Sequence, residues 1–481
     1  MRGRYDLVVL GGGTAGLVSS IVAANMTAKV ALIEPERPGG DCLWTGCVPS
    51  KSLIAAAGLA HRMRNAESVG LRGVEPEIDF GEVMDHVHGA IQALDPHSSP
   101  ERLRKEGVEL IKGRGRFLDS RTLDVEGKEL HFRSAIIATG SDPALPPVEG
   151  LEGDDVSTTD TIWQIRELPR RLIVLGGGPI GCELGQAFRR LGSEVVLVEV
   201  DKRLLGKEEP GASALIESRL IEDGVQVQLQ SKAVEVRRSG AGDPELMIEG
   251  PDGEQAVPFD RILVAAGRRP RTDGMGLAAA GVRVAESGAV ITDDRLRTST
   301  TGIFAAGDVT AKLPFTHVAA NHGRVAAPNA LLGTRRKVDE TVPWVTFTDP
   351  EVGRVGITEA QARERWGSRA VVARTDYADL DRAVTEGDAR GFALLIGDNR
   401  RRLVGATVAA PGGGEAIAEL TARVKAGDKI DSLSTTVHAY PTLAEGPSRA
   451  ADEHLRERYS GTGYRIAARV ALAVRRLIAR G

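Results

Sequence analysis

The chain has 481 residues, a length that allows about three domains, each large enough to bury a core. Its formal net charge of -4 argues against nucleic acid as a partner, and its three cysteines are too few for a disulfide-rich secreted protein. The N-terminal residues show no signal peptide, and no apolar run reaches the roughly 18 residues of a membrane-spanning helix. We therefore expect a soluble, cytoplasmic protein.

Residues 5–34 have the pattern of a dinucleotide-binding βαβ unit. The apolar run Tyr5–Leu10 predicts a buried parallel strand, and a second strand, Lys29–Ile33, ends at Glu34, placed to accept a hydrogen bond from a ribose hydroxyl. Between the strands lies a Gly-x-Gly-x-x-Gly loop, which permits a tight turn and close approach of the backbone to a pyrophosphate. Its glycines are Gly11, Gly13 and Gly16. A plain glycine-rich turn would not need the flanking strands and the acid.

Two cysteines follow this unit in the string GGDCLWTGCVPSK, residues 39–51. Cys42 and Cys47 lie five residues apart. Tetrahedral zinc wants three or four ligands, and no second cysteine pair completes such a set, so we predict no metal site. A close dithiol placed where a Rossmann unit delivers its cofactor indicates a redox-active disulfide that faces a flavin.

The pattern of strand, glycine loop and helix then recurs. Arg171–Leu175 is predicted to be a strand, Cys182–Leu191 a helix, and Val195–Val198 the next strand, which ends at Glu199. The loop between them reads Gly176-Gly177-Gly178-Pro179-Ile180-Gly181. Two such units in one chain indicate two dinucleotides, the arrangement needed for electron transfer between a nicotinamide and a second cofactor.

In this order the motifs resemble the pyridine nucleotide–disulfide oxidoreductases, a family that includes dihydrolipoamide dehydrogenase, glutathione reductase and mercuric reductase. The resemblance covers roughly residues 4–455. It implies an α/β fold with two Rossmann-like domains, for FAD and NAD(P), and a C-terminal α+β dimerisation domain. The strings that fit it further along are RSAIIATG at 133–140, a Pro-rich linker at 141–150, RILVAAGRRP at 261–270, TGIFAAGDV at 301–309 and alternating strands from Pro343. The expected boundaries are 1–150 with 287–340 for FAD, 151–286 for NAD(P), 341–455 for the interface and 456–481 for a tail.

The resemblance also implies a homodimer with a shared active site and one FAD per subunit. Cys47 would be the sulfur nearest the flavin, and Cys42 the interchange thiol that meets the substrate. Lys51 would lie beside the flavin and pair with Glu183; otherwise both are ordinary surface charges.

Other positions are expected to hold the cofactors. Asp308 would bind the ribityl chain of FAD, and Pro314–His317 would pass beside the flavin ring, although His317 is alternatively a core residue. The remaining cofactor positions are Thr14, Ala15, Gly40, Asp41, Gly115, Thr139, Gly140, Ser141, Gly267, Gly307, Phe315 and Thr316. Glu199 favours the free 2′-hydroxyl of NADH over the 2′-phosphate of NADPH, a preference that Lys202 and Arg203 could soften.

The C-terminal part departs from the family pattern. Disulfide reductases carry His-Pro-Thr and, three residues on, a glutamate; that histidine is the acid–base group from the partner subunit. Here Tyr440 takes the histidine's place, with His438 before it and Glu445 after it. A phenol with a pKa near ~10 is a poor base beside an imidazole near ~6.5, though it donates hydrogen bonds well. Which of Tyr440 and His438 serves Cys42 stays open.

We therefore predict an FAD-dependent NAD(P)H oxidoreductase that works through the Cys42–Cys47 disulfide. Its acceptor would be a disulfide, a quinone-like compound or a soft metal ion, unless it runs in reverse as dihydrolipoamide dehydrogenase does. With tyrosine at position 440, the string resembles that of mercuric reductases, but this chain lacks the C-terminal cysteine pair of those enzymes. A direct flavin reductase or transhydrogenase-like enzyme would also fit the motifs, as would a membrane-associated redox-sensing flavoprotein.

The tail, residues 459–481, carries several arginines and no acid. A helix would place Ile466, Val470, Val474 and Leu477 on one face. The arginines are Arg465, Arg469, Arg475, Arg476 and Arg480. Such a basic amphipathic helix can rest weakly on an anionic membrane surface, but we favour a solvated helix packed on its own dimer.

Overall fold

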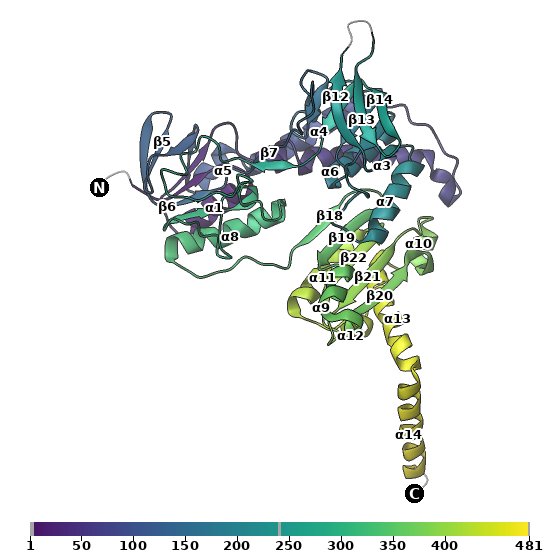
Figure 1. Cartoon of the computed structure of the whole chain (residues 1–481). Helices are drawn as coiled ribbons and strands as arrows, with labels where there is room; N and C mark the ends of the chain where they lie inside the picture. The colour runs from purple at the N-terminus through teal and green to yellow at the C-terminus, as the bar shows by residue number, and fades with distance from the viewer. Residues whose placement is uncertain (1–3, 239–241, 480–481) are drawn as a thin grey trace. The chain divides into compact units, whose positions relative to one another are not determined.

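The computed structural model describes residues 4–238 and 242–479, which form two compact units (Figure 1). The first unit is made from Met1–His61, Pro76–Lys202 and Asp223–Glu340, and the second from Arg62–Glu75, Arg203–Glu222 and Thr341–Gly481. Within the described residues, every helix is too short or too polar to pass through a bilayer.

The first unit contains a seven-stranded sheet in the order β3-β2-β1-β6-β5-β4, with β17 paired to β6. Strand β1 pairs in parallel with both β2 and β6, and its side chains are buried except for the half-buried Asp6. This explains its nearly continuous apolar sequence, because helices cover both faces of a parallel sheet. The strands are β1 (Tyr5–Leu10), β2 (Val30–Glu34), β3 (Val108–Lys112), β4 (Gly115–Phe117), β5 (Thr122–Val125), β6 (Lys128–Ile137) and β17 (Ile303–Ala305).

Helices α1 (Thr14–Asn25) and α8 (Thr316–Leu332) pack together against this sheet (Figure 1). Their close approach depends on Gly323, where a Cβ would lie 2.9 Å from the carbonyl oxygen of Ala15. The other helices of the first segment are α2 (Gly40–Trp44), α3 (Cys47–Arg64), α4 (Phe80–Leu94) and α5 (Pro100–Lys105). Helix α4 buries residues at three- and four-residue spacing, and its N-cap Asp79 accepts a hydrogen bond from the Glu82 amide.

A second sheet in this unit is wholly parallel, in the order β11-β10-β9-β15-β8. Its strands are β8 (Val156–Thr158), β9 (Arg171–Leu175), β10 (Glu194–Val198), β11 (Gln226–Gln228) and β15 (Arg261–Val264), and helix α6 (Pro179–Leu191) packs on β9 and β10. Two antiparallel pieces accompany it. They are a three-stranded sheet of β12 (Lys232–Arg237), β13 (Glu245–Gly250) and β14 (Gly253–Pro258), and a pair of β7 (Ser141–Pro143) with β16 (Arg268–Pro270).

The second unit has a five-stranded antiparallel sheet, β18-β19-β22-β21-β20. Helices α11 and α13 pack on it, and residues of β21 and β22 contribute to the core beneath them. The strands are β18 (Pro343–Thr346), β19 (Glu351–Gly356), β20 (Val371–Asp376), β21 (Phe392–Gly397) and β22 (Leu403–Ala410). The helices are α7 (Pro210–Glu222), α9 (Glu359–Trp366), α10 (Asp381–Thr385), α11 (Gly413–Ala426), α12 (Asp431–Thr435), α13 (Gly446–Ser460) and α14 (Thr462–Ile478).

The strands expected at Tyr5–Leu10 and Arg171–Leu175 are confirmed residue for residue. The helix expected from Cys182 begins earlier, at Pro179, because proline fits the first turn of a helix, where its missing N–H costs nothing. The Pro-rich linker predicted at 141–150 begins with a short strand that the sequence did not indicate. Ser141–Pro143 form β7, whose partner β16 lies more than a hundred residues further along the chain.

Candidate functional site

The first glycine loop has the shape of a pyrophosphate cradle. Gly11 has a φ of +102°, and a Cβ on it would lie 2.4 Å from the carbonyl oxygen of Ala138. A Cβ on Gly16 would lie 1.8 Å from the carbonyl oxygen of Gly11. Helix α1 begins at Thr14, and its N-cap Gly13 provides no side-chain acceptor for the first-turn amides. Those amides, which include the one of Ala15, are the groups that bind a phosphate at a helix N-terminus, so the loop fits a dinucleotide.

The second loop repeats this construction at the start of α6. Gly176 has a φ of +112°, and a Cβ on Gly181 would lie 1.8 Å from the carbonyl oxygen of Gly176. The N-cap Gly178 again provides no side-chain acceptor, and Pro179 occupies the first turn, followed by the exposed Ile180. The chain therefore carries two dinucleotide cradles of one design.

The acid after each second strand is held by its own loop. Glu34 accepts hydrogen bonds from the amides of Gly12 (2.6 Å) and Glu36 (2.9 Å). Glu199 likewise accepts from the amides of Gly177 (2.5 Å) and Asp201 (2.7 Å). Each carboxylate is thus fixed beside its glycine loop, at the position where a ribose hydroxyl is bound in Rossmann units.

The turn at Gly307 and Asp308 follows β17. The Oγ of Ser141 donates to Asp308 at 3.1 Å, and Nδ1 of the buried His322 accepts the Gly307 amide at 3.1 Å. Burial lowers the pKa of His322 to about 4, so the ring is neutral at physiological pH and its acceptor nitrogen is available to the turn. Asp308 is therefore positioned by residues of two distant segments.

Four further positions expected to bind the cofactors lie at or beside the ends of strands. Thr139 donates to the carbonyl oxygen of Arg271 at 2.6 Å, and Gly140, with a φ of +73°, leads into β7. Gly115 opens β4, where a Cβ would lie 3.0 Å from a methyl carbon of Leu10. Gly267, with a φ of +131°, precedes β16.

The cysteine segment lies directly on the first glycine loop. A Cβ on Gly40 would lie 2.5 Å from Cα of Gly13, so only glycine permits this approach. The next residue, Asp41, forms an ion pair with Arg268. Burial nevertheless raises the pKa of Asp41 above its ordinary value. This contact brings Cys42 and Cys47 to the predicted FAD cradle.

Both cysteines of the pair are free thiols, and they hydrogen-bond to each other. Cys42 belongs to α2, and Cys47 is the first residue of α3. The hydrogen bond from Cys42 lowers the pKa of Cys47 to about 6, whereas the same bond and burial raise the pKa of Cys42. The pair therefore holds a thiolate at Cys47 and a thiol at Cys42 near neutral pH.

Two further groups stabilise the Cys47 thiolate. Its Sγ lies 3.3 Å from Oγ1 of Thr316, the first residue of α8, where the positive end of the helix dipole favours an anion. Lys51, one helical turn after Cys47, contributes a positive charge and forms a 2.8 Å ion pair with Glu183 of α6. The predicted pairing of Lys51 with Glu183 is confirmed. Through it the cysteine helix contacts the helix of the second glycine loop.

Phe315 and His317 flank Thr316, and their rings stack with centroids 5.4 Å apart and planes 10° apart. The expected contact of this segment with a flavin ring stays a prediction. The contact of Thr316 with the dithiol is one that the sequence did not predict.

The cysteine segment is anchored by two tryptophans. Nε1 of Trp44 donates to the carbonyl oxygen of Pro38 at 2.9 Å, and the guanidinium of Arg37 lies 3.4 Å from the centre of the Trp44 ring. Nε1 of the buried Trp163 donates to the carbonyl oxygen of Thr45 at 2.7 Å. These bonds fix the residues between the two cysteines.

The residues predicted from the C-terminal string lie in the second unit. Tyr440 is 66% exposed and donates its hydroxyl hydrogen to Asp381 at 2.7 Å, which raises the pKa of the phenol. His438 contacts the Glu419 carboxylate through Nε2 and the Thr436 carbonyl oxygen through Nδ1, each at 3.0 Å.

Glu445 is buried and accepts the Thr442 amide at 3.2 Å. The carboxylate that contacts His438 is that of Glu419, on α11, and not that of Glu445. Glu445 instead closes the capping box at the start of the helical segment that leads into α13.

Several residues of the site have no motif of their own. His322, Arg268 and Trp163 support Asp308, Asp41 and Thr45 from elements far away in sequence. Of these three, only Arg268 could have been found from the sequence, through its place in the string RILVAAGRRP. The contact of Tyr440 with Asp381 could not be predicted from the sequence either, because β21 and β22 separate the two residues in the chain.

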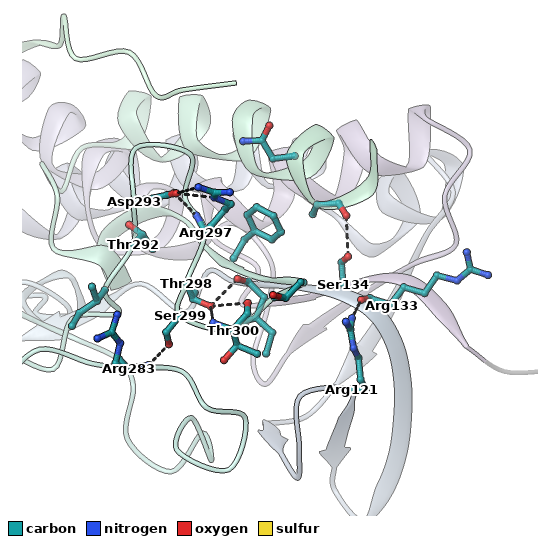
Figure 2. A pocket seen from close by; sticks show the side chains of 17 residues that line it. Arg121, Arg133, Ser134, Arg283, Thr292, Asp293, Arg297, Thr298, Ser299 and Thr300 are labelled. Atoms are coloured by element: carbon teal, nitrogen blue, oxygen red, sulfur yellow. Dashed lines mark hydrogen bonds and ion pairs between the residues drawn. The ribbon is translucent and has the colours of Figure 1, made fainter. Parts of the chain in front are cut away.

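A pocket of about 730 Å³ elsewhere in the first unit is lined by four arginines but by none of the predicted site residues (Figure 2). Three of these arginines have partners in the fold. Arg297 pairs with Asp293, Arg133 lies 3.6 Å from Asp6, and Arg121 donates to the carbonyl oxygen of Arg133. We therefore assign the pocket no part in the chemistry.

Comparison with known proteins agrees with this geometry. Residues 5–323 match the model of the pyridine nucleotide-disulphide oxidoreductase family, and residues 342–451 match its dimerisation domain. A mercuric reductase of Streptomyces lividans is 38% identical over 455 residues, which cover 93% of this chain and 95% of the relative. A dihydrolipoyl dehydrogenase of Thermus scotoductus is also 38% identical, over 93% of this chain and 97% of the relative.

Among solved structures, the HOCl-induced flavoprotein disulfide reductase RclA of Escherichia coli superposes with a TM-score of 0.82. It is 28% identical, and the match covers 93% of this chain and 99% of its own. FAD is the typical cofactor of the family, and the matched dimerisation domain supports a homodimer. The chain therefore belongs to the pyridine nucleotide–disulphide oxidoreductase family and is an FAD-dependent oxidoreductase with Cys42 and Cys47 near its redox-active position.

Proposed function

We propose that this enzyme oxidises NADH and passes two electrons through the Cys42–Cys47 pair to a small-molecule acceptor. The observation that carries the proposal is the environment of Cys47. Three groups stabilise its thiolate: the Cys42 thiol, the hydroxyl of Thr316 and the charge of Lys51. A thiolate held in this way between two dinucleotide cradles suits an electron relay, not a structural role.

FAD, held by the first glycine loop, Glu34 and Asp308, would supply the two-electron relay between nicotinamide and dithiol. The residues of the chain account for the thiol chemistry. Reduction breaks the Cys42–Cys47 bond, and two electrons with one proton leave a thiol at Cys42 and a thiolate at Cys47. Lys51 balances that negative charge, while Glu183 holds Lys51 in place.

The acceptor we favour is a soft metal ion or a quinone-like compound, in preference to a disulfide. A disulfide is attacked by the thiolate of the interchange cysteine, so a base must first take the proton of Cys42. The raised pKa of Cys42 and the raised pKa of Tyr440 both oppose this step. A soft metal ion displaces the thiol proton itself, and a quinone accepts electrons without attack by Cys42.

An anaerobic titration of the holoenzyme with NADH tests the proposal. We expect a long-wavelength absorbance band, from the Cys47 thiolate beside oxidised flavin, after two electrons. Cys42→Ser should show the band without reduction, Cys47→Ser should never show it, and Cys182→Ser, which changes a buried cysteine outside the pair, should behave as the native enzyme does. Flavin bleaching without any band would contradict the proposal and favour a direct flavin reductase.

Turnover with mercuric ion, a quinone, oxidised glutathione and lipoamide then ranks the acceptors. Rates with either disulfide above those with the quinone and the metal would contradict our choice of acceptor.

The proposed preference for NADH depends on Glu199. Glu199→Gln removes the charge that repels a 2′-phosphate, so the ratio of kcat/KM for NADPH to that for NADH should rise by about tenfold or more. Glu194→Gln, at the exposed start of β10, the strand that Glu199 follows, is the matched control and should leave the ratio unchanged. An unchanged ratio in Glu199→Gln would place the specificity elsewhere.

A further inference from the structure

The C-terminal helix α14 has a fully solvent-facing apolar stripe. None of its described residues, Thr462–Ile478, is buried. The exposed side chains Ile466, Val470, Val474 and Leu477 recur at four- and three-residue spacing, which places them on one face. Ile466 is 56% exposed and Leu477 72% exposed. Since no described residue of the same chain buries this face, the predicted packing on the dimer would need the partner subunit.

The helix lies beyond the part of the chain that the family accounts for. The dimerisation domain ends its match at residue 451, within α13, and α14 follows after Gly461. The rings of Tyr459 and Tyr464, with centroids 4.6 Å apart and planes tilted by 42°, join the two helices. Helix α14 is therefore an addition to the family fold, not a part of its redox centre.

The charges of the helix identify what can cover the stripe. Arg465, Arg469, Arg475 and Arg476 lie on α14, a fifth arginine, Arg480, lies outside the described residues, and the segment from residue 459 onward contains no acid. Two copies of such a helix packed face to face would bring like charges together, which opposes self-association. Nucleic acid would attract the arginines but would leave the apolar stripe in water. An anionic lipid surface accommodates both features, because arginines reach the headgroups while the stripe enters the acyl boundary.

We infer that α14 docks the enzyme on an anionic lipid bilayer, lying in the plane of the interface. The helix has 17 residues, a length of about 25 Å, and binds along its side without crossing the membrane. A short helix without tertiary packing is marginally stable in water, and insertion of the stripe supplies the missing burial. A homodimer carries two such helices, so both can engage one bilayer and strengthen binding without new contacts.

Co-sedimentation of the full-length holoenzyme with vesicles tests the inference. Binding is expected to vesicles of phosphatidylcholine with phosphatidylglycerol, and not to vesicles of phosphatidylcholine alone. Changing Arg465, Arg469, Arg475 and Arg476 together to glutamine should weaken binding by about fivefold for each arginine, whereas the four changes to lysine should preserve it. Flavin absorbance and NADH-dependent turnover in solution report that each variant is folded.

The stripe is tested separately from the charge. Ile466→Gln with Val470→Gln should abolish sedimentation, while Leu472→Gln, on the side of the arginines, serves as the matched control and should bind. Sedimentation that survives loss of the stripe, or equal binding to duplex DNA, would mean charge attraction alone and overturn the inference. Absence of binding by the native enzyme would overturn it as well. So would a stripe variant with a smaller oligomeric mass, because a second copy would then cover the helix.

Discussion

The two thiols of the redox pair differ in protonation because of the hydrogen bond between them. Cys42 donates this bond to Cys47, which lowers the pKa of Cys47 and raises that of Cys42, whereas Thr316 and Lys51 lower the pKa of both thiols. Charge is thus concentrated on one sulfur, while the other stays neutral. Glu183 opposes this effect on Cys47 but is needed to hold Lys51, so the ion pair sets how strongly the thiolate is stabilised.

The charge balance predicts opposite effects of two substitutions. Since the pKa of Cys47 is lowered to about 6, the thiolate band of the two-electron-reduced enzyme should be full above pH 7 and fade as the pH falls through about 6. Lys51→Met should move this midpoint upward by about one pH unit, because a positive charge is lost. Glu183→Gln should move it downward, because a negative charge is lost. A pH titration of the band measures both.

Lys51→Arg is the control for the first substitution, since it keeps the charge and should keep the midpoint. Shifts of the same sign in Lys51→Met and Glu183→Gln would show that the variants disturb packing and not charge.

At the scale of elements, the two glycine loops are built alike but are expected to hold different dinucleotides. Gly16 and Gly181 occupy equivalent places, and a Cβ on either would lie 1.8 Å from a backbone carbonyl oxygen. The carbonyl groups are those of Gly11 and Gly176, and moving either one would separate the strand before the loop from the helix after it. The same alanine substitution should therefore damage one cradle and spare the other.

Gly181→Ala should keep a full complement of FAD but be reduced by NADH far more slowly, with KM for NADH raised by about tenfold or more. Gly16→Ala should instead be purified with little FAD. Flavin content from absorbance and stopped-flow reduction by NADH separate the two effects, and each variant is the control for the other. Loss of FAD in Gly181→Ala would contradict the assignment of the loops.

These elements could be predicted because their patterns are local. Strand Tyr5–Leu10, loop Gly11–Gly16 and acid Glu34 lie within one short stretch of the chain, residues 5–34, and each has a backbone or packing requirement that only certain residues meet. The supports of the site are not local. His322 contacts Gly307 from the second turn of α8, and β7 pairs with β16 although the strands of the second sheet lie between them in the sequence. Neither contact leaves a periodicity or spacing in the sequence.

At the scale of the whole molecule, the chemistry is divided between parts of the chain with different tasks. The first unit carries the dithiol and both cradles, and the second unit carries Tyr440, His438 and Glu445 on the family's dimerisation domain. Tyr440 and the fully exposed Val437 belong to one short segment of that domain. An aromatic side chain held outward by Asp381 suits a contact that the single chain does not make.

If Tyr440 completes the site of the partner subunit, two impaired variants should restore each other's activity. Cys47→Ser lacks the thiolate, and Tyr440→Ala, which we expect to lower turnover by about tenfold, lacks the phenol. In a mixed dimer, one site has both defects and the other has neither. Denaturing and refolding an equal mixture with FAD should therefore recover about a quarter of the native activity, because half of the dimers are mixed and each has one intact site.

Each variant refolded by itself gives the background for this measurement, and native enzyme refolded in the same way gives the full value. Activity in the mixture equal to the mean of the two variants would mean that Tyr440 acts within its own chain or not at all. Tyr440→Phe separates the roles of the phenol. If its hydroxyl donates a hydrogen bond during turnover, Phe should be as slow as Ala, whereas native activity in Phe would mean that the ring alone lines the site.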